Sequence, residues 1–208
     1  MKKYLALGAL ALAWAGSAQA VTTINFAAGS GALPSDVTVF QNFDSLAAGT
    51  SLGTNASVYA ASNANVVARP AFGSTGNFGA VNAGGSYTVN FGPSSVLSFV
   101  LGSLDRFNTL TLRYTDGSSL ALQGGAIIND LDFDAGNRTS AETNGVVTYR
   151  VTSGALLSGA TFASTENAFE FDNLSAVPEP AAWGMMIFGF ALVGGALRRR
   201  PATKVRFA

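Results

Sequence analysis

The chain has 208 residues, of which 48% are hydrophobic and 12% are charged, and it contains no cysteine and no histidine. Without cysteine it has no disulfides, zinc–thiolate sites or cysteine nucleophiles, and without histidine it has no Ser-His-Asp triad and no imidazole metal ligands. The formal net charge is zero. Many of the basic residues, however, gather at the two ends of the chain, so its parts differ in charge.

The first 20 residues are typical of a secretory signal peptide. Lys2 and Lys3 precede an uncharged run, Tyr4–Ala15, and the small residues Ala18 and Ala20 follow with one residue between them. A basic start, a short apolar run and an A-x-A site together define such peptides. We therefore expect export, with cleavage directly after Ala20.

A second apolar run lies near the other end of the chain. Ala181–Leu197 has no charged residue, and as a helix it would span roughly 25 Å. That is short for a hydrocarbon core of about 30 Å, but local thinning of the bilayer allows it to span. Arg198, Arg199 and Arg200 follow at once, and such basic tails stay in the cytoplasm. We expect a transmembrane helix over 181–197 that anchors the precursor in the inner membrane.

Pro178, Glu179 and Pro180 stand before this run, and Trp183 lies within it. With the three arginines these residues resemble a PEP-CTERM sorting signal of the P-E-P-x-x-W-A variant, with Gly184 in the place of its Ala. The resemblance covers 177–208. It implies processing near the prolines by exosortase, a membrane-embedded transpeptidase-like enzyme, and transfer of the protein to the cell surface or the extracellular space. From the residues alone, the two prolines indicate an extended segment, for which a rigid spacer is the alternative function.

The part between the two signals, 21–176, is acidic. It holds five arginines, no lysine and 11 carboxylates, which gives a net charge of −6. Nucleic acids and anionic lipids need cationic contacts, so the charge argues against both as partners. It is compatible with solubility and with divalent cations.

The same part alternates between apolar and polar residues. Thr109–Thr115 and Ser118–Leu122 flank Asp116-Gly117, which predicts a hairpin with a type I′ turn. Val96–Leu101 is a nearly continuous apolar run, typical of a central strand. Further strands are expected at 37–40, 57–59, 66–69, 86–91, 146–151, 161–163 and 168–174. About eight to ten short strands with glycine-rich turns predict one all-β domain, a jelly-roll-like β-sandwich.

Three segments of this domain resemble a family of exosortase-dependent surface proteins. They are Asn42-Phe43-Asp44 with Gly49, the stretch 102–109, and the closing stretch 169–174. The resemblance extends over most of 37–176. It implies a location at the cell surface but no established activity. The similarity of this family to lectin-like and carbohydrate-binding β-sandwiches is one of fold only.

One candidate calcium site lies in the sequence Asn129–Gly136. Asp130, Asp132 and Asp134 alternate with other residues, so on a strand their side chains would share one face. Calcium favours such clusters of oxygen ligands. A solvated acidic edge that prevents sheet-to-sheet aggregation is the alternative.

Two further groups of polar residues are candidates. Asp44, Glu170 and Asp172 lie in the first and last β segments, where a jelly roll would bring them together around a structural calcium ion; the alternative is a turn that closes the last strand. Asp105 and Asn108 lie in the loop before the hairpin. They are candidates to bind a sugar hydroxyl, or else to cap the turn locally.

We expect a structural or adhesive protein of the cell surface or extracellular matrix, with exopolysaccharide as a partner, and not an enzyme. The alternative is a calcium-assisted carbohydrate-binding module, which requires an exposed aromatic residue; the candidates in turn-rich stretches are Tyr59, Phe72, Phe78 and Phe107. A glycoside hydrolase is a remote alternative, because it needs two carboxylates about 5–9.5 Å apart in a cleft and no pair stands out.

Overall fold

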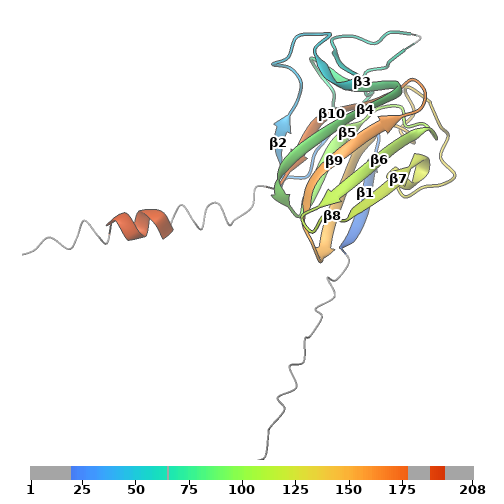
Figure 1. Ribbon diagram of the computed structural model, residues 1–208. Helices are drawn as coiled ribbons and strands as arrows, with labels where there is room; N and C mark the ends of the chain where they lie inside the picture. Colours follow the sequence, from blue (N-terminus) through green and yellow to red (C-terminus); the bar gives the residue numbers. More distant parts are fainter. Residues whose placement is uncertain (1–19, 65, 178–187, 195–208) are drawn as a thin grey trace, which may run out of the picture.

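The computed structural model describes residues 20–64, 66–177 and 188–194. In this part of the chain, ten β-strands and one short 3-10 helix follow one another (Figure 1). They are β1 (Val21–Ala28), β2 (Thr38–Gln41), β3 (Ser51–Tyr59), β4 (Phe78–Ser94), β5 (Val96–Leu101), β6 (Asn108–Tyr114), β7 (Ser119–Gln123), η1 (Gly124–Ile127), β8 (Gly145–Ser153), β9 (Leu157–Ser164) and β10 (Phe169–Ala176).

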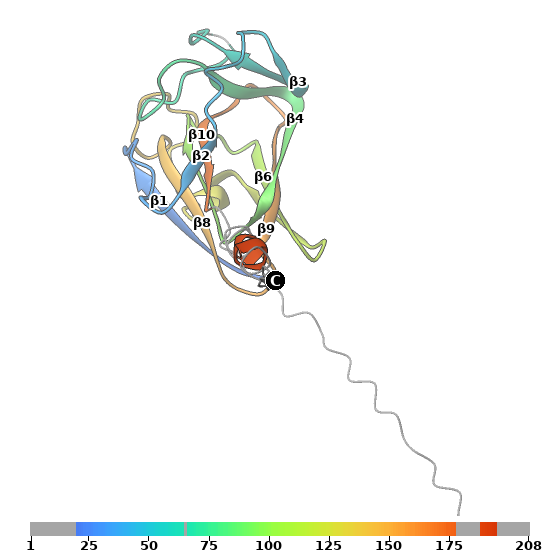
Figure 2. The ribbon, with the colours of Figure 1, turned by 90° about the vertical axis from the view of Figure 1, so that its left-hand side faces the viewer.

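All ten strands belong to one sheet, in which the main path runs β1-β8-β5-β10-β4-β9-β6-β7. Strand β2 pairs with β10 outside this path, and β3 pairs with β4. The sheet curls until its two halves face each other, as the two views show (Figures 1 and 2). The predicted all-β class is confirmed. The strands form one continuous curled sheet, and the jelly-roll assignment stays a prediction.

The long strand β4 belongs to both halves of the sheet. Near its start, Gly79–Val81 pair with β10, whereas Gly85–Asn90 pair with β9. Gly84 stands between these two segments with a φ of 67°, a value that costs glycine little and other residues much more. At Gly85 a Cβ atom would lie 2.7 Å from the carbonyl oxygen of Thr54. The two glycines therefore let the strand bend where it passes from one half to the other.

Aromatic rings fill the space between the two halves. Phe162 of β9 and Phe171 of β10 have ring centroids 4.3 Å apart. Phe99 of β5 meets Phe162 at 5.1 Å, and Tyr87 of β4 stacks on Phe171 at 5.5 Å. The three phenylalanines are fully buried. Rings from β4, β5, β9 and β10 thus hold the curl closed.

Strand β5 matches the predicted strand 96–101 residue for residue, and all six of its side chains are buried between β8 and β10. The predicted hairpin is also confirmed, because Leu110 lies opposite Leu122 and Leu112 opposite Leu120.

The predicted turn type of this hairpin is wrong. A type I′ turn needs a positive φ at both central residues, and only Gly117 has one, at 85°. The amide of Gly117 donates to the carbonyl of Tyr114 at 3.1 Å, and the amide of Tyr114 donates to the carbonyl of Ser118 at 3.0 Å. This pattern is a type I turn followed by a glycine bulge, which places one more residue in the loop.

One further strand prediction is wrong, and one strand was not predicted. The segment Val66–Arg69 is no strand: Val67 makes one isolated bridge with Asn63, and the amide of Ala68 donates to a glutamate side chain instead of a neighbouring strand. Conversely, strand β1 was not predicted. It pairs with β8, and most of its side chains alternate between exposed and half-buried positions, so its sequence carries only a weak apolar pattern.

The predicted terminal signals fall mostly outside the described residues. This applies to Ala18 and 1–19, to Pro178, Glu179, Pro180 and Trp183, and to Arg198, Arg199 and Arg200. Ala20 is described and packs against the core. Residues 188–194 are helical, and in the described parts of the chain no helix has the length and apolar character needed to cross a membrane.

We predict that Phe171→Ala lowers the free energy of unfolding by about 3–5 kcal/mol, because it removes the ring that contacts both halves of the sheet. Urea unfolding of the purified domain, residues 21–176, measures the change. Leu131→Ala is the control: this side chain is 73% exposed, so its removal should change stability by less than about 0.5 kcal/mol. Equal effects of the two substitutions would contradict the assignment of the core.

Candidate functional site

Strand β10 has an aromatic face and a carboxylate face. Side chains alternate along a strand, so Phe169 and Phe171 point into the aromatic core while Glu170 and Asp172 point the opposite way. Loops cover this second face, and Glu170 and Asp172 are only 2% and 0% exposed. The cluster around these two carboxylates is the candidate site.

Glu170 joins two loops to the strand. Its Oε1 accepts a hydrogen bond from the amide of Ala68 at 2.8 Å, and its Oε2 accepts one from the hydroxyl of Ser103 at 2.9 Å. Burial raises the pKa of Glu170 to about 7, although both hydrogen bonds act in the opposite direction. Near neutral pH this carboxyl is therefore partly protonated, and its role in the structure is to fix backbone and hydroxyl donors.

Asp172 holds a neighbouring loop in the same way. Its Oδ2 accepts a hydrogen bond from the hydroxyl of Ser74 at 2.7 Å, and its Oδ1 accepts one from the amide of Asn173, also at 2.7 Å. Burial raises the pKa of Asp172 to about 6, and the negative charge of Asp44 adds to the increase. Asp44 in turn accepts a hydrogen bond from the amide of Asn77 at 2.7 Å. The structure thus brings the predicted pair Asp44 and Asp172 near each other, with each carboxylate already bonded to the protein.

The predicted ligand residues Asp105 and Asn108 are adjacent, but they differ in accessibility. Asn108 is fully buried. Its side chain accepts a hydrogen bond from the amide of Asp105 at 2.8 Å and donates to Ser164 and Ala168. Of the two roles considered, local capping of the turn is the one that these bonds perform. Asp105 is half-buried, and burial together with the charge of Glu166 raises its pKa to about 6.

The three aspartates of the first candidate calcium site lie in a loop and not on a strand. The side chain of Asp130 accepts a hydrogen bond from the amide of Asp132 at 3.0 Å, which closes a local turn. All three aspartates, Asp134 included, are exposed. Among the residues that the structure describes, no group of three or more carboxylates is arranged to hold a metal ion. Calcium binding at this loop or at Asp44 and Asp172 stays a prediction.

None of the four aromatic residues considered for carbohydrate binding is fully exposed. Phe78 is fully buried, which corrects its assignment as an exposed candidate. Tyr59 stacks on it at 6.0 Å, and its hydroxyl accepts a hydrogen bond from Asn82 at 2.7 Å. Phe72 and Phe107 are half-buried.

Sequence reasoning missed Asn144, which connects three loops. Its Oδ1 accepts hydrogen bonds from the amides of Ala71 and Ser103, and its Nδ2 donates to the carbonyls of Asn137 and Ser140. Asn144 is fully buried. An asparagine directly before a glycine in a polar stretch predicts an ordinary turn, so the sequence carried no signal for this role.

The comparisons with known proteins bear on the end of β10. Residues 176–200 match the family described as the PEP-CTERM protein-sorting motif. The match begins at Ala176, the last residue of β10. No curated protein matches the chain. No solved structure matches it either.

The motif that follows the all-β domain implies an exported protein that is sorted to the cell surface. Residues 176–200 carry a PEP-CTERM sorting signal, which implies processing by exosortase. The resemblance that the sequence suggested for the tail is confirmed over 176–200. The resemblance of 37–176 to a particular family of surface proteins stays a prediction.

The pKa of Glu170 leads to a prediction about stability. A carboxyl whose pKa is raised from 4.5 to about 7 on folding stabilises the fold fully below pH 4.5. This contribution is lost as the pH rises through 7, on the order of 3 kcal/mol. In Glu170→Gln the amide can accept from Ala68 and donate to Ser103, as the protonated acid does. We expect the variant to be more stable than the wild type at pH 8 and nearly equal to it at pH 4.5, as measured by urea unfolding.

The matched control is Glu142→Gln, which neutralises an exposed glutamate and should leave the pH dependence of unfolding unchanged. If Glu170→Gln were destabilising at pH 8, the charged form would be the one that the loops require, contrary to this account.

Asn144→Ala should lower the free energy of unfolding by about 2–5 kcal/mol, because it leaves buried amides and carbonyls without partners. Asn25→Ala, at an exposed position of β1, should cost less than about 0.5 kcal/mol. Hydrogen exchange of the Ala71 and Ser103 amides locates the effect, since both should lose protection in Asn144→Ala. Unchanged protection would show that the side chain does not hold these loops.

Proposed function

We propose that residues 21–176 form a structural or adhesive component of the cell surface or of the extracellular polysaccharide matrix. One observation carries the proposal: the PEP-CTERM motif follows directly on β10, a strand inside the sheet. The sorting signal is therefore joined to a strand that is paired along both of its edges.

The hydrogen bonding of β10 supports a load-bearing role. One edge of β10 pairs with β5, and the other edge pairs first with β4 and then with β2. Just beyond the strand, the amide of Val177 donates to the hydroxyl of Ser94 at 3.1 Å. A pull on the C-terminal end would have to break bonds on both sides of β10 together. This suits a protein held at a surface by that end.

The alternatives receive less support. Asp44 and Asp172 already accept hydrogen bonds within the protein, so a calcium-assisted carbohydrate-binding module would need to break these bonds to use them. Glu170, whose raised pKa would suit a hydrolase, is 2% exposed and covered by loops. We therefore propose a protein without enzymatic activity, and with neither nucleic acid nor calcium as a necessary partner.

The tail completes the proposal. Residues 181–197 would hold the exported precursor in the inner membrane, with Arg198–Arg200 on the cytoplasmic side, until exosortase acts at Pro178-Glu179-Pro180. Exopolysaccharide is the proposed partner of the sorted domain.

The proposal is tested in cells that possess exosortase, with the gene for this chain deleted and then restored. Restored wild-type chain should reach the surface or matrix fraction and return cell cohesion to its original value. A chain carrying Pro178→Ala and Glu179→Ala should accumulate in the membrane fraction and fail to restore cohesion. Disruption of exosortase should reproduce that result. Wild-type cohesion in cells without the chain would contradict the structural role while leaving the sorting intact.

A further inference from the structure

The domain begins and finishes at the same end of its sheet. Val21, the first residue of β1, pairs with Ser153 at the end of β8. Ala176, the last residue of β10, pairs with Leu97 near the start of β5, and β5 runs antiparallel to β8. The turns β4–β5, β6–β7 and β8–β9 lie at this end too, at the bottom of the domain in Figure 1. We call it the exit end, because the sorting motif starts there, and we call the opposite end the loop end.

The charges of the domain are unevenly divided between the two ends. Of the 11 carboxylates in 21–176, only Asp36 and Asp116 lie near the exit end; the others lie in the loops of the loop end or in the first half of β10. Arg150 and Arg113 are also near the exit end, opposite the first residues of β5 and β7. The two carboxylates and two arginines cancel, so the net charge of −6 belongs to the loop end.

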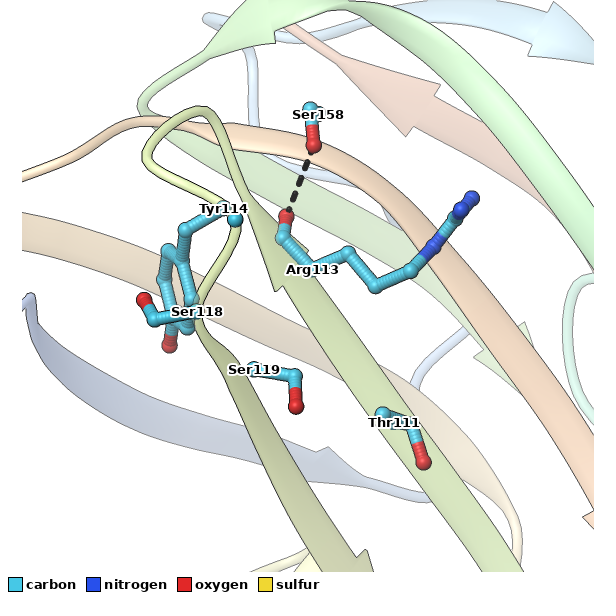
Figure 3. Close-up of a pocket in the computed structure, with 7 residues that line it drawn as sticks. Thr111, Arg113, Tyr114, Ser118, Ser119 and Ser158 are labelled. Carbon is cyan, nitrogen blue, oxygen red and sulfur yellow. Dashed lines mark hydrogen bonds between the residues drawn. The ribbon is translucent and has the colours of Figure 1, made fainter.

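The few charged groups of the exit end are bonded within the domain. Arg150 donates to both carboxylate oxygens of Asp36, at 2.7 and 2.9 Å. Asp116 accepts from the amide and the hydroxyl of Ser118, at 2.9 and 2.6 Å. Arg113 donates to a backbone carbonyl of β4 at 3.2 Å, and Figure 3 shows its guanidinium pointing away from Ser118. The β6–β7 turn therefore presents hydroxyl groups, while the arginine beside it is directed elsewhere.

Exposed apolar side chains are distributed in the opposite way. Among the described residues of the domain, one large exposed apolar side chain, Leu131, belongs to the loop end. Four are near the exit end, with exposed fractions between 37% and 53%: Leu120, Phe40, Val39 and Val21. Phe40 also packs on Phe91, near the end of β4, with ring centroids 5.4 Å apart. Exposed apolar groups at an end without net charge are typical of a surface that meets lipid.

The chain leaves the exit end at a fixed point. The hydroxyl of Ser94, a residue that is only 1% exposed, accepts a hydrogen bond from the amide of Val177 at 3.1 Å and donates one to its carbonyl, also at 3.1 Å. From Val177 to Ala181, where the predicted transmembrane run begins, the chain can reach at most about 14 Å. An anchored precursor would therefore keep its exit end close to the bilayer.

The division of charge favours one orientation of the domain in that position. A membrane with anionic lipids has a negative surface potential, which falls off within a Debye length of about 8 Å. The eight residues of β10 span roughly 26 Å. With the exit end against the bilayer, the carboxylates of the loop end lie largely outside this field. In any orientation that brings the loop end to the surface, they would be repelled.

From these observations we propose that the exit end of the domain docks on the lipid surface of the membrane while the precursor is anchored. Val39, Phe40 and Leu120 contact the headgroup layer, and the acidic loop end points away from it. This inference rests on the membrane-anchored precursor of the proposed function and adds an interaction surface to it.

The test uses the absence of cysteine from the chain, since a single new cysteine can then carry a fluorescent label. Full-length chains with Val39→Cys, Leu120→Cys or Leu131→Cys are labelled and reconstituted in vesicles of phosphatidylcholine and phosphatidylglycerol. Some of the lipids carry a nitroxide quencher on the headgroup. Quenching at positions 39 and 120 should be at least threefold stronger than at position 131. Thermal unfolding of each labelled chain confirms that it is folded.

A longer linker separates docking from the effect of the short tether. A flexible Gly/Ser insertion of ten residues between Val177 and Pro178 lets the domain move away from the bilayer by roughly a further 17 Å. If the exit end has its own affinity for lipid, the difference in quenching between positions 120 and 131 should persist in this extended chain.

Substitutions at the exit end test the contacts in the same extended chain. Val39→Glu combined with Phe40→Glu places two charges where the lipid would lie, so quenching at position 120 should fall at least twofold. The matched control is Leu131→Glu, which adds a charge at an exposed apolar position of the loop end and should leave quenching at position 120 unchanged.

Three results would overturn the inference: equal quenching at the three positions, loss of the difference in the extended chain, or undiminished quenching after the two glutamate substitutions. Equal quenching is also the outcome if the exit end binds a protein and not lipid, because the vesicles contain no other protein. These results would leave the sorting and the cohesion measured in cells unaffected. A chain that failed to float with the vesicles would instead contradict the anchored precursor of the proposed function, and the inference with it.

Discussion

The burial of both faces of strand β10 is the constraint on which the rest of the structure depends. On one face, Phe171 joins the two halves of the curled sheet through its contacts with Phe162 and Tyr87. On the other face, Glu170 and Asp172 fix loops that would otherwise have unpaired donors. Because a strand has only two faces and two edges, and β10 is engaged on all four, it cannot shift without disturbing core, loops and sheet together.

The carboxylate face also shows why this arrangement is sensitive to protonation. A buried carboxylate is unfavourable unless its hydrogen bonds compensate for the lost hydration. For Glu170 they compensate only in part, since its pKa stays well above the ordinary value. Asp172 and Asp105 share the direction of the shift and its main cause. The loops that these carboxyl groups bind are therefore more stable in mildly acidic conditions than in alkaline ones.

Local patterns in the sequence predicted the strands whose neighbours lie close in the chain or whose side chains are wholly apolar. The hairpin of β6 and β7 and the central strand β5 follow from alternation and from a continuous apolar run. Strand β1 could not be found in this way, because its pairing with β8 joins residues more than 100 positions apart and leaves its side chains half-exposed. The turn at Gly117 was misassigned in type because the Asp-Gly pair suits more than one geometry.

The candidate site was less accessible to such reasoning. Asp44 and Asp172 could be singled out as acidic residues of the first and last β segments expected from the sequence, and they do come near each other, although Asp44 lies in the turn after β2. However, nothing local indicates that Asn144 is buried or that Asn108 turns inward. Whether a polar side chain binds a ligand or caps a loop depends on which loops fold over it, and that is decided by contacts such as Ala68 with Glu170, 102 residues apart.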